Sequence, residues 1–561
     1  MAKRDFKYLA LSHMWGDPNL NQHLKLLTSN IAEFQKAVPW ASLSSVYKEA
    51  VRVTLALGYN YLWVDSLCIL QDKDHPDWKH EAPLMSTVYG NADCNLAFLF
   101  PSFSNDNAHT RSDPRDWNPC ILREATPGRC GVSIQHLTSA MRQAYQSTED
   151  KDWLIQRNWP LFSRAWTFQE YLLSPRTLLL GHKNLMFHCS HHFYDELLGP
   201  IASPPLAADD TTPKQGRDYG KTRYFPPSLA QGMAQDVVIS SPRALSFAID
   251  WQALFNEYRS RELTKPNDRV IAFAGIARAF SNIGSMTYLA GCWAEYFALT
   301  MLWYVDRKRE ATVRRDGPSV RRGGIVEYPV HIREEVEQEV PSWSQFSVPI
   351  YTHHQPFFMF NNDEIFLRSK SCEKPPRVWW DDIYWTDLVS VGFGSRSQNG
   401  FPESGFFDFR GLEVDLSMPL LPVKTSWLKD LEQRFANIRK LDRADARLQW
   451  VPDFTYYPDK PHEDGSREPS PPSNGVLALV AEFQICRPAG QYLVQRRSAG
   501  LVLVRVPERG AWKRVGAWKL SIKICGVDVD SENAGDVARR WKKYRTWEVG
   551  RHWTMENVAM V

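Results

Sequence analysis

The most constraining feature of the sequence is a pair of short apolar runs near the N-terminus, joined by a helical pattern. Residues 8–12 (Tyr-Leu-Ala-Leu-Ser) are typical of a short buried strand, which the turn residues 15–18 (Trp-Gly-Asp-Pro) end. Residues 44–57 place apolar side chains at helical spacing, and Gly58 follows them as a helix C-terminal residue. Residues 61–69 form a second apolar run, which we interpret as another buried strand. This order predicts a parallel α/β unit with a right-handed crossover.

The next 120 residues continue the alternation of helical and strand patterns. Pro83 lies inside a helical pattern over residues 78–92, so this helix is expected either to begin near Pro83 or to be kinked there. Strands 8–12, 61–69 and 95–100 are expected to be neighbours in one mainly parallel sheet, with helix 44–57 packed on a face. The further elements expected are a helix over 78–92, a strand over 95–100, a helix over 162–173, and a hairpin of strands 177–180 and 184–189.

The length of 561 residues predicts more than one hydrophobic core, because single cores usually stop growing at about 250–300 residues. With 43% hydrophobic and 23% charged residues, the composition is that of a globular protein. We expect an α/β domain over 1–195, a loop or linker over 196–245, a helical region over 246–346, and a β-containing region over 347–561. A disordered insertion is expected near 458–474, where Pro, Ser and Asp are frequent.

Charge and short motifs exclude several classes of function. A net charge of +3 is close to neutral for this size, so we expect no nucleic-acid partner. The sequence has no secretory signal pattern and no apolar run long enough for a membrane span, which favours a cytoplasmic location. The nine cysteines form no C-x-x-C pair, as is typical of reduced thiols, and Cys68 is interpreted as buried rather than nucleophilic. The stretch 188–192 (His-Cys-Ser-His-His) lacks a second cluster at zinc-finger spacing, so no metal site is expected.

Three segments resemble, in order and spacing, the three blocks of the fungal HET (heterokaryon incompatibility) domain. They are 8–16 (Tyr-Leu-Ala-Leu-Ser-His-Met-Trp-Gly), 61–69 (Tyr-Leu-Trp-Val-Asp-Ser-Leu-Cys-Ile) and 162–174 (Phe-Ser-Arg-Ala-Trp-Thr-Phe-Gln-Glu-Tyr-Leu-Leu-Ser). The resemblance covers residues 7–189 and extends more weakly to about residue 346. It implies a TIR-like α/β domain, because HET domains are similar in fold to TIR domains. It also implies a cytoplasmic factor of fungal innate immunity, whose activation triggers programmed cell death.

Two carboxylates are candidate catalytic residues, Asp65 and Glu81. Asp65 lies in or just after an apolar run, where a carboxylate is costly unless it is hydrogen-bonded or part of a site. Glu81 shares a helix face with Trp78, three residues before it. NAD-hydrolysing TIR domains carry a Glu close behind a Trp, so the resemblance implies that Glu81 stabilises an oxocarbenium-like ribosyl transition state. The alternatives are a structural carboxylate at residue 65 and a solvated surface Glu at residue 81.

Five further residues are candidates for binding a nucleotide: Ser12, Trp15, Arg164, Trp166 and Glu170. Ser12 and Trp15 follow the first strand and could hydrogen-bond to a nucleotide and stack on it. Trp166 and Glu170 are i,i+4 neighbours on one helix face. Arg164 could hold a phosphate or pair with Asp65, Glu81 or Glu170. Core packing for Trp15 and a structural ion pair for Arg164 are the alternatives.

Two hypotheses about function follow. In the first, the protein cleaves the nicotinamide–ribose bond of NAD, which would be its substrate, and needs no cofactor. In the second, it is a non-catalytic signalling module that acts by self-association or by binding a protein partner. The sequence lacks the phosphate-binding loop, dinucleotide-binding, zinc-protease and serine-hydrolase motifs, which removes support from those classes of enzyme.

Overall fold

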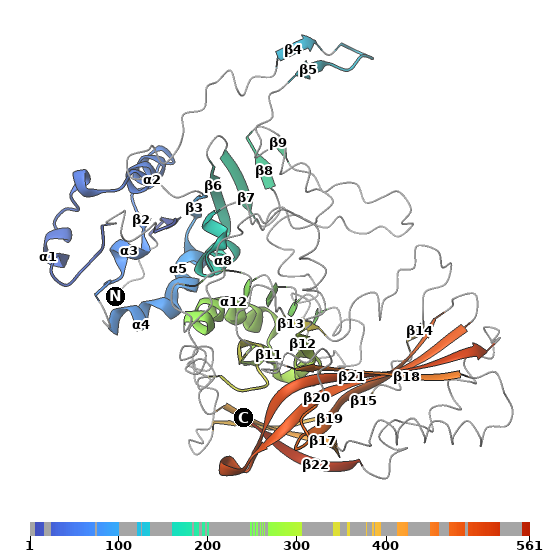
Figure 1. The fold of residues 1–561 in the computed structure, drawn as a ribbon. Helices are drawn as coiled ribbons and strands as arrows, with labels where there is room; N and C mark the ends of the chain where they lie inside the picture. Colours follow the sequence, from blue (N-terminus) through green and yellow to red (C-terminus); the bar gives the residue numbers. More distant parts are fainter. Residues whose placement is uncertain are drawn as a thin grey trace, which may run out of the picture. The chain divides into compact units, whose positions relative to one another are not determined.

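The computed structural model describes residues 6–15, 24–72, 76–99, 120–124, 126–134, 160–181, 185–189, 193–196, 199–200, 247–248, 251–252, 254–255, 258–259, 261, 263, 268–305, 340–347, 356–358, 377–378, 384–385, 387–393, 412–423, 449–458, 471–487, 492–527 and 553–561 (Figure 1). The chain divides into two compact units. The first comprises Met1–Ala230 and Arg261–Phe280, and the second comprises Gln231–Ser260 and Ser281–Val561. Each unit combines two separate segments of the chain, so the domain boundaries expected from the sequence remain predictions.

The first unit is built on a seven-stranded sheet in the order β2-β1-β3-β6-β7-β8-β9. The first four strands in this order run parallel, and β7, β8 and β9 continue the sheet antiparallel. The expected parallel neighbours and the expected hairpin are therefore confirmed. The strands are β1 (Leu9–Ser12), β2 (Leu62–Trp63), β3 (Cys94–Phe98), β6 (Arg176–Leu180), β7 (Leu185–Cys189), β8 (Phe193–Asp195) and β9 (Gly199–Pro200). A separate hairpin pairs β4 (Cys120–Arg123) with β5 (Val132–Ile134).

Local sequence signals set the limits of the helices in this unit. The Ser44 hydroxyl accepts a hydrogen bond from the backbone N–H of Tyr47 and begins α2, and Gly58, at φ +80°, follows its end. Pro83 lies in a 3₁₀ turn (Ala82–Leu84) that separates α4 from α5, so the helical pattern is interrupted at Pro83 as expected and a new helix begins two residues after it. The helices are α1 (Ile31–Phe34), α2 (Ser45–Ala56), α3 (Asp65–Cys68), α4 (Pro76–Glu81), α5 (Met85–Asn91), α8 (Trp166–Leu173) and α12 (Arg269–Gly284), with 3₁₀ turns at Trp40–Ser42 and Pro160–Ser163.

The strand expected over 61–69 is wrong beyond Trp63, because α3 begins at Asp65. The chain turns there because the backbone N–H groups of Leu67 and Cys68 both bond to the carbonyl oxygen of Val64. Oδ1 of Asp65 also accepts a hydrogen bond from the backbone N–H of Ser66 at 2.7 Å. These bonds replace strand pairing with one helical turn at the carboxyl end of β2.

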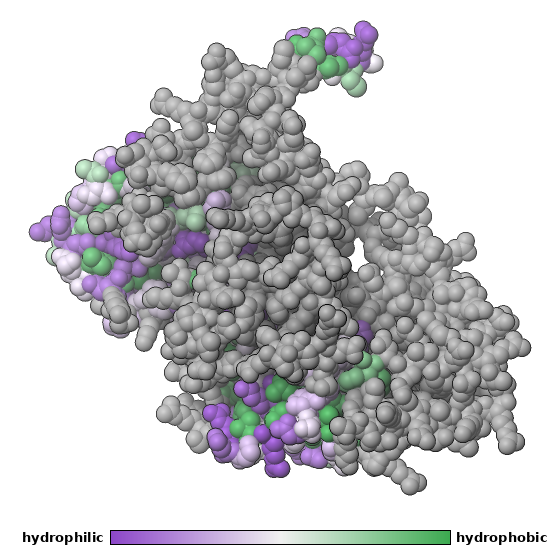
Figure 2. Space-filling view, in the orientation of Figure 1, coloured by the Kyte–Doolittle hydropathy of each residue, from purple (hydrophilic) through white to green (hydrophobic). Residues whose placement is uncertain are grey.

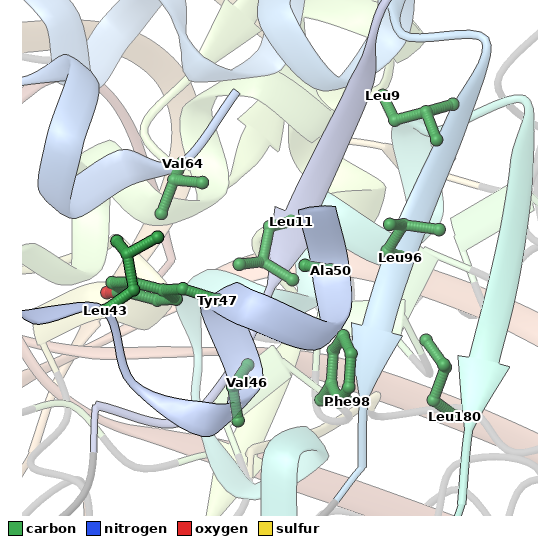
Figure 3. Close-up of a cluster of buried hydrophobic side chains, with 10 residues drawn as sticks. All are labelled: Leu9, Leu11, Leu43, Val46, Tyr47, Ala50, Val64, Leu96, Phe98 and Leu180. Atoms are coloured by element: carbon green, nitrogen blue, oxygen red, sulfur yellow. The ribbon is translucent and has the colours of Figure 1, made fainter. Parts of the chain in front are cut away.

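Helices cover both faces of the sheet (Figure 1). On one face, α2 packs on alternate residues of the parallel strands, and Figure 3 shows this core of Leu9, Leu11, Leu43, Val46, Tyr47, Ala50, Val64, Leu96, Phe98 and Leu180. On the other face, Ala10 of β1 contacts Met85 and Tyr89 of α5. Further along the same face, Ala97 of β3 and Leu179 of β6 contact Tyr171 of α8. The sheet is therefore the middle layer of three.

The second unit contains a large, mainly antiparallel sheet in the order β14-β19-β20-β21-β22-β17-β16, with β15 beside β19 and β18 beside β21. This confirms a β-rich C-terminal region. Gly500 is required where β20 meets β19, because a Cβ there would lie 1.8 Å from the carbonyl oxygen of Ala478. The strands are β14 (Arg377–Val378), β15 (Tyr384–Trp385), β16 (Asp387–Phe393), β17 (Leu412–Pro422), β18 (Gln449–Pro458), β19 (Val476–Arg487), β20 (Tyr492–Val506), β21 (Ala511–Val527) and β22 (Thr554–Met560).

The segment 281–358 of this unit contributes short elements around an aromatic cluster. Trp251 and Trp293 pack with ring centroids 4.9 Å apart, and the indole N–H of Trp251 donates to the carbonyl oxygen of Gly291. Of the insertion expected at 458–474, residues 459–470 lie outside the described part, Pro458 ends β18, and 471–474 form a turn. The elements are β10 (Tyr288–Leu289), β11 (Cys292–Trp293), α13 (Phe297–Thr300), β12 (Trp303–Val305) and β13 (Pro356–Phe358), with 3₁₀ turns at Ala294–Tyr296, Gln345–Ser347 and, later in the chain, Pro507–Arg509.

Hydrophilic and hydrophobic residues are interspersed on the surface that Figure 2 colours. Among the described helices, none is both long and apolar enough to cross a bilayer.

We predict that Leu96→Ala destabilises the first unit by about 3 kcal/mol, because Leu96 is fully buried in the core below α2 and the change leaves a cavity. Urea unfolding followed by tryptophan fluorescence measures the change. Leu55→Ala on the same α2 is the matched control, since Leu55 is 62% exposed and its loss should cost less than about 0.5 kcal/mol. Equal effects of the two changes would contradict this assignment of the core.

Candidate functional site

The carboxyl ends of β1, β2 and β3 lie at one edge of the parallel part of the sheet. Ser12 is the last residue of β1, and Asp65 follows the end of β2 by two residues. This edge is where α/β folds place their ligands, at the ends of the parallel strands.

A buried layer of polar side chains lies between the sheet and α8 next to this edge. The hydroxyl of Ser12 donates to Oε2 of Glu170 at 2.5 Å, and Nδ2 of Asn95 donates to the same hydroxyl at 3.0 Å. Ser12, Asn95 and Glu170 are each 3% exposed or less. Polar groups are rarely buried so completely unless they satisfy one another, so this network holds α8 in one position on the sheet.

Burial raises the pKa of the Glu170 carboxyl from 4.5 to about 7. Arg164 and the hydrogen bond from Ser12 act in the opposite direction, and the negative charge of Asp65 adds to the increase. Glu170 is therefore a neutral acid over much of the acidic range. A neutral carboxyl is the less costly form inside a protein.

A contact between Trp15 and Asp65 links the first two sequence segments, and it lies nearer the surface than the network around Ser12. The indole N–H of Trp15 donates to Oδ2 of Asp65 at 3.0 Å, which fixes the half-buried ring beside the half-buried carboxylate. The ammonium of Lys25 lies 5.3 Å from the centre of the Trp15 ring. An aromatic ring, a carboxylate and a cation are therefore grouped near the carboxyl ends of β1 and β2.

Arg164 joins the third segment to the first, although not through the ion pair that we expected. Its NH1 group donates to the carbonyl oxygen of His13, directly after β1. Among the described residues it forms no ion pair with Asp65, Glu81 or Glu170. Its positive charge nevertheless lowers the pKa of Glu170. Arg164 thus acts on the buried acid at a distance while bracing the loop after β1.

A second buried network was not expected from the sequence. The hydroxyl of Tyr47 on α2 is hydrogen-bonded to Nε2 of His13 at 3.0 Å and to the hydroxyl of Ser66 at 2.6 Å. All three residues are 2% exposed or less. The signal in the sequence was the polar residue directly after each apolar run, His13 after β1 and Ser66 after Asp65. Tyr47 itself looked like an ordinary apolar position of a helix.

Glu81 is not part of either network. Its side chain is 32% exposed, and it is paired with Nδ1 of the neighbouring His80 at 2.8 Å. Trp78, one turn earlier on α4, does contact the third segment, because its ring packs edge-on against Trp166 with the centroids 6.1 Å apart. The structure therefore groups Ser12, Trp15, Asp65, Arg164 and Glu170, with Trp166 beside Trp78 and Glu81 on the same helix as Trp78.

The histidine and cysteine candidates have other surroundings. His188 is buried and its Nδ1 is hydrogen-bonded to the hydroxyl of Tyr171, while His191 and His192 lie outside the described residues. Within the described ranges, no group of three His, Cys, Asp or Glu side chains could hold a metal ion. Cys68 is exposed and not buried as expected, because the helical turn α3 directs it outward where a strand would have buried it.

Residues 8–170 match the family model described as "Heterokaryon incompatibility protein (HET)". No curated protein matches the chain, and no solved structure matches it. The matched range begins at β1 and ends within α8, so it contains the buried network of Ser12, Asn95 and Glu170 together with Trp15 and Asp65.

We predict that the stability difference between the wild type and Glu170→Gln depends on pH. Between pH 4.5 and 7 the folded protein keeps the Glu170 proton while the unfolded chain loses it. The stability contribution of this group is therefore fully present below about pH 4.5, falls as the pH rises to about 7, and is then constant. Relative to Glu170→Gln, which has no such proton, the wild type should lose up to about 3 kcal/mol across this range. Urea unfolding at pH 4.5, 6 and 8 measures it, and a constant difference would show that folding does not raise the pKa of Glu170.

Proposed function

We propose, from the premise that this chain is a heterokaryon incompatibility (HET) domain protein, that it is an effector of fungal non-self recognition and programmed cell death. The domain match supports a role in heterokaryon incompatibility. The way in which the domain acts is the part that we infer from the site.

We infer further that the edge beside Asp65 binds NAD and cleaves it in the manner of a TIR domain. The observation that supports this is the convergence of three segments far apart in the sequence. Trp15 is hydrogen-bonded to Asp65, Ser12 to Glu170, and Arg164 to the loop after β1. Half-buried rings and charged groups gathered at the ends of parallel strands suit a ligand that carries both a base and phosphates.

In this proposal the bond between C1′ of the ribose and the nicotinamide nitrogen breaks, and nicotinamide leaves with the bonding electrons. Water adds to C1′ and loses its proton to solvent, which gives ADP-ribose. Asp65 and Glu81 are partly exposed carboxylates that could act on the substrate, because a negative charge stabilises the ribosyl cation. Arg164 would hold a phosphate and Trp15 would stack on a ring. Buried Glu170 would hold Ser12 and α8 in position through its hydrogen bond and would not touch the substrate.

The second candidate is a non-catalytic module that acts by self-association or through a protein partner. The placement of Glu81 favours it, because Glu81 is bonded to His80 and is separate from the network around Asp65. A domain that signals by contact needs the buried network for shape alone, and its function should survive the loss of either exposed carboxylate.

We predict that purified full-length protein releases nicotinamide from NAD and that Asp65→Asn lowers this rate at least about 100-fold, because the side chain loses its charge. The amide oxygen can keep only one of the two hydrogen bonds that Asp65 accepts, from Trp15 or from the backbone N–H of Ser66. Glu81→Gln should lower it to a similar extent. Nicotinamide is measured by chromatography, alongside a fungal cell-death assay of the same variants.

Glu49→Gln is the matched control, since Glu49 is a carboxylate on the surface of α2 paired only with Arg52 among the described residues, and it should leave the rate unchanged. If the wild type leaves NAD intact and both Asp65→Asn and Glu81→Gln still cause cell death, the enzymatic proposal fails and the contact-based module stands.

A further inference from the structure

The helix α8 is covered on every side. Its residues from Thr167 to Leu172 are six consecutive buried positions. A helix that lies on a protein surface keeps an exposed polar stripe, so six buried positions in a row mean that the sheet and α5 do not cover α8 alone. Arg261, and Gly275 of α12, contribute to the additional cover, about 90 to 105 residues beyond the matched HET range and within the same compact unit.

The contact between α12 and the HET helices is close enough to require glycine. A Cβ on Gly275 would lie 2.4 Å from Cβ of Ser86 on α5 and 2.5 Å from Oε1 of Gln169 on α8. Real Cβ atoms do not approach other atoms so closely, and both neighbours are held in helices. Glycine costs about 1 kcal/mol relative to alanine inside a helix, so its presence in the middle of α12 indicates a packing requirement.

A second contact fixes the start of the same segment. The guanidinium of Arg261 lies 4.4 Å from the ring centre of Phe168 on α8 and 5.7 Å from that of Phe162. Arg261 is 5% exposed, so this cation–π contact is desolvated and correspondingly strong. The middle of α12 is also enclosed, with Ala272, Phe273, Ala274, Ile276, Ala277 and Phe280 each 2% exposed or less.

We propose that Ser86, Phe162, Phe168 and Gln169 form a docking surface on the HET helices, that its partner is the segment Arg261–Phe280 of the same chain, and that this docked segment controls the position of α8. Gln169, which meets Gly275, is the neighbour of Glu170, whose carboxyl is bonded to the sheet. The chain before and after the segment belongs to the second unit. The second unit is therefore joined covalently to both ends of the element that fixes the buried acid. This inference does not depend on the chemistry proposed for the site.

Gly275→Ala in the full-length chain tests the proposal, because its two possible effects have opposite signs. If α12 were not docked, alanine would favour the helix and raise the thermal midpoint. Since it is docked, we expect a lower midpoint and hydrogen–deuterium exchange of the α8 amides about tenfold faster, with the strands β19–β21 of the second unit unchanged. Asn282→Ala is the matched control: the side chain is exposed on the same helix, so alanine should raise the midpoint slightly and leave α8 unchanged.

Two further variants keep the test decisive. Adding Ser86→Gly to Gly275→Ala removes the nearest clashing Cβ and should restore much of the α8 protection, whereas additive losses would contradict a direct contact. Should Gly275→Ala fail to fold, Arg261→Met removes the charge over Phe168 while keeping an apolar chain, and it should also accelerate exchange in α8. Unchanged α8 exchange in Arg261→Met, or a raised midpoint in Gly275→Ala, would overturn the proposal.

Discussion

The hydrogen bond from Ser12 to Glu170 is the interaction on which the arrangement of the first unit depends. It crosses from the last residue of β1 to the interior of α8, at a depth where water cannot replace it. An apolar contact at this position would tolerate small shifts of the helix along the sheet, whereas a hydrogen bond between buried groups does not. Asn95 extends the constraint to β3, so one hydroxyl fixes the positions of two strands and a helix. The positions of Asp65 and Trp15 at the sheet edge therefore depend on this buried hydrogen bond.

The polar residues near this edge form two layers, a buried one and a half-buried one, which differ in charge. The lower layer contains Glu170, whose pKa burial raises to about 7, together with Tyr89, whose pKa burial also raises. The upper layer contains Asp65 and Arg164, both half-buried and charged. Because Asp65 raises the pKa of Glu170 and Arg164 lowers it, the state of the lower layer responds to a change in charge above it. A charged ligand bound at the edge would therefore change the protonation of the acid beneath it.

Much of this fold could be predicted from the sequence because local signals and burial agreed. The strands at residues 9–12 and 94–98, the helix from Ser45 to Ala56 and the hairpin that follows α8 were each predicted by apolar spacing and capping residues. The strand over 61–69 was overpredicted, because an apolar run does not reveal that the bonds around Asp65 will close a helical turn. The candidate residues that belong to the three segments lie near one another, whereas Glu81, which belongs to none of them, lies apart. Tyr47 was missed because its hydroxyl partners, His13 and Ser66, lie far from it in sequence.

The burial of α8 marks the limit of what a local pattern can predict. Its sequence, Trp-Thr-Phe-Gln-Glu-Tyr-Leu-Leu, contains two polar residues, Gln169 and Glu170, and both are buried. Glu170 finds Ser12 on the sheet, and Gln169 meets Gly275, which lies 106 positions further along the chain. Neither partner can be inferred from spacing, since each depends on a segment that is distant in sequence. The matched HET range ends at Glu170, but part of the surface that encloses its last helix is supplied by residues outside that range. The physical boundary of the module therefore lies beyond the boundary that sequence similarity detects, and it includes α12 as far as Phe280.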